Sequence, residues 1–86
     1  MTTDTSIAKH VMKTVRIQVP KSLHEVPIIS NLITEHNVIV NIRGAILDQK
    51  ATGGGWFDLL LTGDSVQVEG AVSYLKKVGV EIWNEE

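Results

Sequence analysis

Two hydrophobic periodicities alternate along this chain of 86 residues, and their order restricts the fold more than any other feature of the sequence. Every second residue is apolar within Lys13–Val19, which is typical of a strand with one buried face. The apolar stripe that follows has helical spacing and predicts a helix from about Pro27 to His36, because proline suits the first helical position. Asn37 can then adopt the left-handed conformation that ends a helix.

The second half of the chain repeats this change of periodicity. β-Branched residues from Val38 to Leu47 predict a strand, and residues 56–62 (WFDLLLT) predict the next one. The residues between them, 48–55, end in three glycines and are expected to form a wide hairpin loop that could fold over a small ligand. A second helical stripe lies between residues 64 and 79, and Val80–Trp83 predicts the last strand.

These elements follow one another as β-α-β-β-α-β, the order that predicts an α+β, ferredoxin-like sandwich. In this fold a four-stranded antiparallel sheet carries two helices on one face. Residues 1–11 are mostly polar and without periodicity, so we expect a flexible N-terminal tail. Residues 12–86 are expected to form a single domain, since chains divide into separate cores only beyond about 250 residues.

The face of the sheet that carries no helix is expected to be more apolar than a solvated surface usually is. Simple alternation along the strands assigns to it Arg16, Gln18, Ile39, Asn41, Arg43, Ala45, Leu47, Trp56, Asp58, Leu60, Glu81 and Trp83. A bulge near Gly44 would exchange the two sides for the residues that follow it. Exposed apolar patches commonly mark binding surfaces, so we expect this face to bind a ligand or a partner.

Composition excludes several kinds of partner. Eight Lys and Arg residues against ten Asp and Glu residues give a net charge of −2, so the chain lacks the basic surface that nucleic acids require. No apolar run approaches the roughly 18 residues of a membrane span, and we expect a cytoplasmic location with no direct membrane insertion. The absence of cysteine excludes thiolate zinc sites, iron–sulfur clusters and thiol nucleophiles.

The sequence contains no pattern typical of catalysis or of metal binding. His10, His24 and His36 have none of the spacings that pair metal ligands. The serines lack the sequence context of an activated nucleophile. The glycines at 53–55 join two strands rather than a strand and a helix, which disfavours a phosphate-binding loop. We therefore expect no enzyme activity, no catalytic residues, no metal and no cofactor.

Two polar residues on the second strand are the strongest candidates for a binding site. Asn41 stands among isoleucine and valine residues, although asparagine is depleted in strands. Its amide carries two donors and an acceptor, so we expect it to contact a polar group of a ligand or partner. Arg43 can pair a carboxylate bidentately, whereas the simpler interpretation is an exposed, solvated arginine.

Several short motifs together resemble the NIL domain family over Lys13 to Trp83. They are Pro27 before the helix, His36-Asn37-Val38 leading to Asn41-Ile42, the glycine hairpin, Leu60-Leu61-Thr62-Gly63-Asp64, the helix with Ala71, and Val80-Glu81-Ile82. The resemblance implies an ACT-like regulatory domain. Such domains occur at the C-terminus of methionine-importer ATPase subunits, where they pair and bind methionine, which restrains transport, or in fusions with ferredoxin modules. The residue that matches the family's ligand-contacting asparagine is Asn41.

The chain departs from the family pattern on the same strand. The family is named for an Asn-Ile-Leu run, and Arg43 stands where the leucine is expected. The glycine loop is longer than in the importer domains, and Trp56 and Trp83 are bulky for that surface. Arg43 would alter a methionine pocket, or it would pair the carboxylate of a ligand.

Two hypotheses follow from these features. The first is a non-catalytic homodimeric sensor that binds an amino acid, methionine-like, between its subunits. Its ligand-binding residues would be Asn41, Arg43, Trp56 and Leu60, and its interface residues Ile39, Leu47 and Trp83. Because no ATPase or ferredoxin segment accompanies this stand-alone sequence, we expect it to act in trans on a transporter or an enzyme. The second is a protein-interaction adaptor that docks a larger partner on the same face without a small ligand.

Overall fold

The computed structural model describes residues 10–23, 25–47 and 54–86. The predicted tail up to residue 9, His24 and the loop residues 48–53 lie outside the described residues. The described part of the chain forms β1 (His10–Val19), the short 3-10 helix η1 (Lys21–Leu23), α1 (Ile28–His36), β2 (Ile39–Leu47), β3 (Gly55–Asp64), α2 (Ser65–Val78) and β4 (Glu81–Glu85). The predicted order of strands and helices is confirmed.

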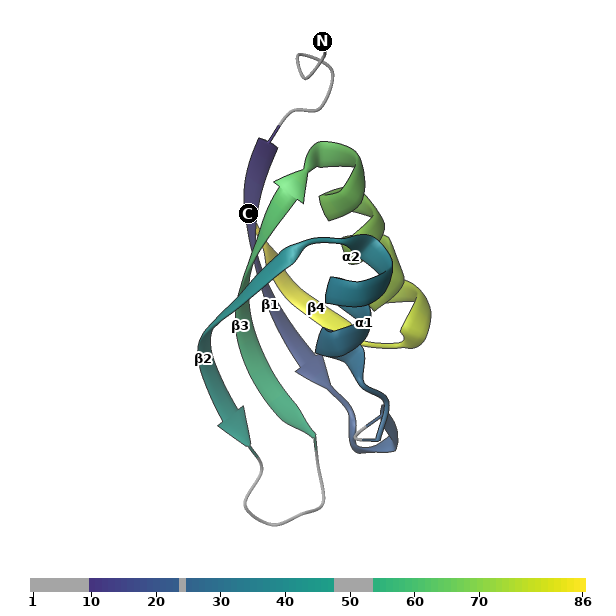
Figure 1. Ribbon diagram of the computed structural model, residues 1–86. Coiled ribbons are helices and arrows are strands. Elements are labelled where there is room, and N and C mark those ends of the chain that lie inside the picture. Colours follow the sequence, from purple (N-terminus) through teal and green to yellow (C-terminus); the bar gives the residue numbers. More distant parts are fainter. Residues whose placement is uncertain (1–9, 24, 48–53) are drawn as a thin grey trace, which may run out of the picture.

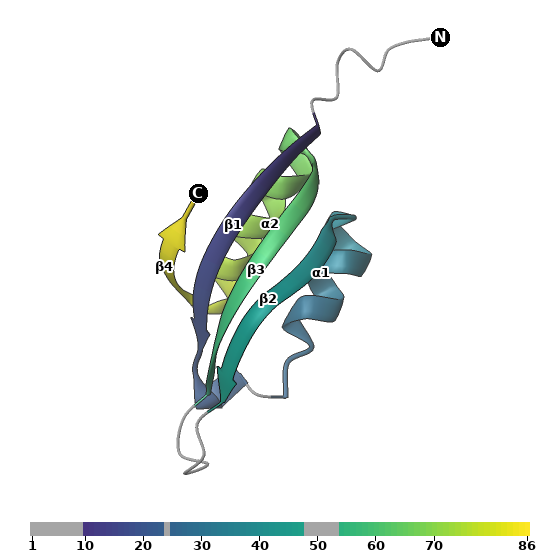
Figure 2. The same cartoon turned by 90° about the vertical axis from the view of Figure 1, so that its left-hand side faces the viewer.

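The strands form one antiparallel sheet in the order β2-β3-β1-β4, so β1 and β3 are central and β2 and β4 are the edges. Both helices pack on the same side of the sheet (Figure 1), and after a turn of 90° that brings the other side of the sheet toward the viewer they lie behind and beside the strands (Figure 2). This arrangement is the predicted α+β, ferredoxin-like fold. Within the described residues, both helices cover one face of the sheet and neither covers the other face.

A core of aliphatic side chains lies between the sheet and the helices. At its centre Val15 pairs with Leu59 and both are fully buried, since opposite residues of antiparallel strands share a face. The stripe predicted for α2 is buried as expected and consists of Val68, Ala71, Val72 and Leu75. The other buried hydrophobic residues are Ile17, Ile28, Leu32, Val38, Leu61 and Val80.

Both helices end in the left-handed backbone conformation, which was predicted for the first helix. Asn37 ends α1 with φ 58° and ψ 35°, and its N–H donates to the carbonyl of Ile33. Gly79 ends α2 with φ 105°. Pro27 precedes α1 instead of occupying its first position, and its ψ of 70° is not helical, so the helix was predicted to begin one residue too early.

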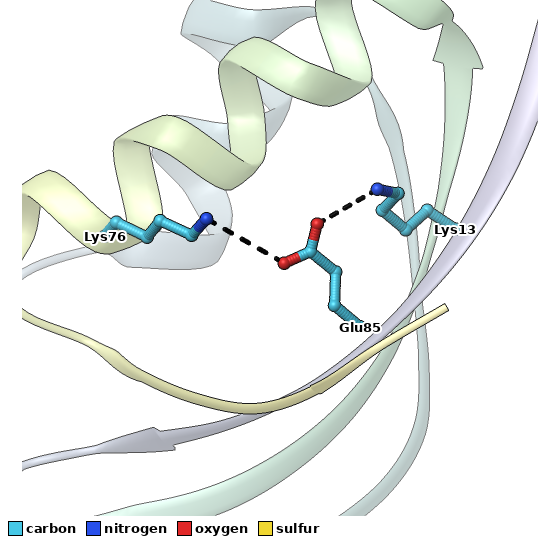
Figure 3. A network of polar contacts seen from close by, with 3 residues as sticks. All are labelled: Lys13, Lys76 and Glu85. Atoms are coloured by element: carbon cyan, nitrogen blue, oxygen red, sulfur yellow. Dashed lines mark hydrogen bonds and ion pairs between the residues drawn. The ribbon is translucent and has the colours of Figure 1, made fainter.

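The first and last strands are longer than predicted. β1 begins at His10, so His10 and Val11 belong to the sheet and not to the predicted tail. β4 extends to Glu85, whose carboxylate oxygens lie 3.0 Å from Lys13 Nζ and 3.9 Å from Lys76 Nζ (Figure 3). A periodicity argument misses these strand ends because Val11 and Met12 are adjacent apolar residues without alternation, and because Asn84 and Glu85 are both polar.

A β-bulge in β2 changes which residues reach the open side of the sheet. Ile42 pairs with Leu59, and Gly44 pairs with the adjacent Asp58, so Arg43 is the extra residue of the bulge. In a bulge two consecutive residues face one residue of the partner strand, and the alternation of sides is shifted beyond it.

The predicted placement of Ala45 and Leu47 on the open side is therefore wrong. Both residues pair with helix-facing positions of β3. Gly44 and Ile46 lie on the open side instead. The bulge that the sequence allowed near Gly44 is present, and it is the cause of this exchange.

Candidate functional site

The side of the sheet that the helices leave bare (Figure 2) is called the open face below. Cross-strand pairing assigns its residues, because directly opposite residues point to the same side. They are Met12, Thr14, Arg16 and Gln18 of β1, Ile39, Asn41, Arg43, Gly44 and Ile46 of β2, Trp56, Asp58, Leu60 and Thr62 of β3, and Glu81, Trp83 and Asn84 of β4.

Asn41 lies on the open face, as the alternation before the bulge predicts. Its cross-strand partner is Leu60, a second predicted site residue. The side chain is exposed, and no residue in the described part of the chain hydrogen-bonds to its amide. The amide can therefore donate and accept hydrogen bonds without breaking existing ones.

Arg43 extends over the open face from its position in the bulge. Its Nη1 donates to Thr14 Oγ1 over 3.3 Å, so the side chain reaches from β2 across β3 to β1. Thr14 pairs with Leu60, which places the guanidinium group in the same row of the sheet as Asn41. None of the described carboxylates forms an ion pair with Arg43, so most of its donors can serve an anion.

Sequence reasoning did not assign Thr14 to the site. The signal that could have identified it is the strand order of the ferredoxin-like fold, which places β1 beside β3. With that order, a long side chain on β2 comes within reach of β1.

Trp56 and Trp83 meet on the open face although they belong to strands on either side of β1. Their ring centroids are 5.0 Å apart and the planes are inclined by 52°, a favourable geometry for an aromatic pair. Trp83 is the extra residue of a bulge in β4, and its Nε1 donates to Glu81 Oε1 over 3.3 Å. Trp83 remains 58% exposed, so the pair presents apolar surface to the solvent.

Asp58 is an incompletely paired carboxylate near the middle of the open face. Its Oδ2 lies 3.8 Å from Arg16 Nη2, which is an ion pair without a hydrogen bond. Its Oδ1 is buried and accepts no hydrogen bond from the described residues. A hollow of about 680 Å³ adjoins this carboxylate and is lined by Arg16, Gly44, Ala45, Ile46, Trp56, Phe57 and Asp58.

The remaining predicted site residues lie on different sides of the sheet. Ile39 pairs with Thr62 on the open face, two residues along β2 from Asn41. Leu47 lies on the helix side, where it lines a groove of about 480 Å³. No charged side chain borders this groove within the described residues, so it offers little to orient a polar ligand.

The described residues contain no group of three or more His, Asp or Glu side chains that could hold a metal ion. Within the same residues, no helix is both long and apolar enough to span a membrane.

Comparison with known proteins identifies the family of this chain. The model of the NIL domain matches residues 13–84. An uncharacterized protein of Synechococcus elongatus is 31% identical over 71 residues, which cover 83% of this chain and 88% of that protein. An uncharacterized protein of Synechocystis sp. is 32% identical over 69 residues, which cover 80% of this chain and 70% of that protein.

A solved structure shares the fold as well. It is the C-terminal domain of an ABC transporter ATP-binding protein from Enterococcus faecalis, with a TM-score of 0.71 and 29% sequence identity. The similarity covers 86% of this chain and 80% of that domain. The match of the family model over most of the sequence establishes that this chain belongs to the NIL domain family.

Proposed function

We propose that this chain is a non-catalytic regulatory domain that binds a methionine-like amino acid on its open face, between two copies of the chain. In this proposal the bound domain acts on another protein, either a transporter or an enzyme. The observation that carries the proposal is the presence of two available polar side chains on the open face. Among the described residues, the Asn41 amide makes no hydrogen bond and the Arg43 guanidinium forms no ion pair with a carboxylate.

The chemistry of these side chains suits a small zwitterion. The Arg43 guanidinium can bind a carboxylate through two parallel hydrogen bonds. The Asn41 amide can donate to the same carboxylate or accept from an ammonium group. Leu60 lies between Asn41 and Thr14, and Trp56, four residues away on the same face of β3, offers apolar contact at the hollow beside Asp58.

The comparisons support a regulatory role of this kind. Membership in the NIL family and similarity to a C-terminal domain of an ABC transporter ATP-binding protein favour a domain that modulates another protein. A domain of 86 residues buries a small core, so a ligand held between two copies would stabilise both the fold and the dimer by mass action.

Titration calorimetry and thermal melting with the twenty amino acids test this proposal. We expect L-methionine or a close analogue to release heat and to raise the melting temperature. Asn41→Ala should weaken binding by about tenfold, the typical effect of losing one or two hydrogen bonds, with unchanged circular dichroism because the side chain is exposed. If no amino acid produces heat or a melting shift, the proposal is wrong.

A second candidate function rests on the exposed tryptophan pair. Trp and Arg are enriched in the energetically dominant part of protein interfaces, and Trp83 projects beside Trp56. If the domain is a protein-interaction adaptor, Trp56→Ala and Trp83→Ala should abolish capture of a partner, whereas Asn41→Ala should have little effect. The opposite ranking would favour the small-ligand function.

A further inference from the structure

We infer that Asp58 is the anchor for the ammonium group of the ligand, so that the open face selects an α-amino acid with a free amino group. In this arrangement Arg43 holds the carboxylate, and the hollow beside Trp56 receives the apolar side chain. The inference rests on the proposed function and adds to it the orientation of the ligand and the chemical class that the site accepts.

The first support is the unsatisfied oxygen of Asp58. Buried carboxylate oxygens normally accept at least one hydrogen bond, and Oδ1 accepts none from the described residues. Oδ1 is buried while the side chain as a whole is 27% exposed, so an incoming cation would reach the carboxylate through Oδ2, which Arg16 approaches only to 3.8 Å, beyond hydrogen-bond distance. An ammonium group supplies three donors and a full positive charge, which is what this carboxylate lacks.

The second support is the space beside the Asp58 carboxylate. Gly44 is the cross-strand partner of Asp58, and a Cβ placed on Gly44 would meet no heavy atom within 4 Å. The missing side chain leaves the hollow of about 680 Å³ open at the position where a ligand would approach the carboxylate. Ile46 and Trp56, which are cross-strand partners, line the same hollow and provide apolar contact.

The third support is the spacing between the two charged anchors. Arg43 donates to Thr14 of β1, which lies two residues from Arg16, the cross-strand partner of Asp58. Thr14 and Asp58 are therefore diagonal neighbours on adjacent strands, which are about 7–8 Å apart. An α-amino acid, with its two charged groups about 3 Å apart and a hydrogen bond of about 2.8 Å at each end, spans roughly 9 Å. The flexible Arg43 side chain can accommodate the small difference.

Titration of the full chain with L-methionine and N-acetyl-L-methionine tests the role of Asp58. Acetylation removes the positive charge of the amino group and retains the carboxylate and the thioether side chain. We expect the acetylated compound to bind at least about tenfold more weakly than methionine, the change typical of losing a charge-assisted hydrogen bond. L-Methioninamide, which lacks the carboxylate, should also bind more weakly.

Variants of the chain distinguish a specific contact between Asp58 and the ligand's ammonium group from a general effect of removing one negative charge. Asp58→Asn should weaken methionine binding by about tenfold to a hundredfold and should reduce the preference for methionine over its acetylated form. Glu69→Gln removes the same charge from an exposed position of α2 and should leave binding unchanged. Gly44→Leu should fill the hollow and abolish binding, while Gly44→Ala serves as its smaller control.

The possible failures are distinguishable. If the wild-type chain binds none of the amino acids, the proposed function and this inference both fail. If methionine and N-acetyl-L-methionine bind equally well, and Asp58→Asn binds methionine like the wild type, the role of Asp58 is disproved while amino-acid binding stands. Circular dichroism and thermal melting of Asp58→Asn and Gly44→Leu verify that a loss of binding does not reflect unfolding.

Discussion

At the scale of single residues, two glycines near the β2–β3 pair differ sharply in the space available to a side chain. A Cβ on Gly54 would overlap the carbonyl oxygen of Val19 and approach the backbone of Pro20, whereas a Cβ on Gly44 would meet no heavy atom of the described residues within 4 Å. We therefore expect Gly54→Ala to lower the free energy of unfolding by about 1–3 kcal/mol, the range typical of steric overpacking.

The matched control for this prediction is Gly44→Ala, which should change the free energy of unfolding by no more than about 0.5 kcal/mol. Chemical denaturation of both variants measures the difference. Equal stabilities would show that the segment around Gly54 moves away from Val19 at no cost in free energy.

Residue-level predictions from sequence succeeded where the strand alternation was unbroken. The alternation places Asn41, Trp56 and Leu60 on the open face, and the structure confirms these positions. It could not show that Asp58 lacks a hydrogen bond or that Arg43 reaches Thr14, because both depend on distances between strands that are remote in sequence.

At the scale of elements, the end of α1 depends on a residue that tolerates a positive φ. Asn37 has φ 58°, a conformation that costs an alanine about 1–2 kcal/mol and a glycine nothing. Asn37→Ala should therefore lower the free energy of unfolding by about 1 kcal/mol.

Asn37→Gly should leave stability unchanged or slightly higher, since glycine is the residue most often found at this position of a helix end. Thermal or urea denaturation of the two variants checks the prediction. An alanine variant as stable as the glycine variant would mean that the chain ends α1 by another conformation.

The boundaries and sides of the elements were harder to predict than their order. Ala45, Ile46 and Leu47 are all apolar, so their sequence carries no alternation from which the side of each residue could be read. The pairing of Gly44 with Asp58 determines the side of the sheet on which each of these residues lies. β4 was predicted too short for a related reason. Glu85 has the polar character of a solvated chain end, and only its contacts with Lys13 and Lys76 indicate that it belongs to the sheet.

At the scale of the whole molecule, the edge strand β2 leaves apolar surface exposed on both sides of the sheet. Ile39 on the open face is 66% exposed and Leu47 on the helix side is 67% exposed. Exposed apolar edge strands favour association with another chain, in agreement with the homodimer that we propose.

Ile39→Lys combined with Leu47→Lys should therefore keep the fold and produce a monomer, because the positive charges would repel a second copy at the same edge. Sedimentation equilibrium measures the oligomeric state. Val66→Lys is the control, since Val66 on α2 is 78% exposed and lies outside the proposed interface. A wild-type chain that is monomeric both with and without methionine would contradict the proposed dimer.

The extra residue in β2 adds one side chain to the open face and changes nothing on the buried face. Without Arg43, Gly44 would follow Ile42 directly, so Ile42 would still pair with Leu59 and Gly44 with Asp58. The residues from Ala45 to Leu47 would keep their present sides, and the open face would lose its long basic side chain. Insertion or deletion of a single residue at this position thus gives evolution a simple route to change ligand preference in related domains without altering the buried core.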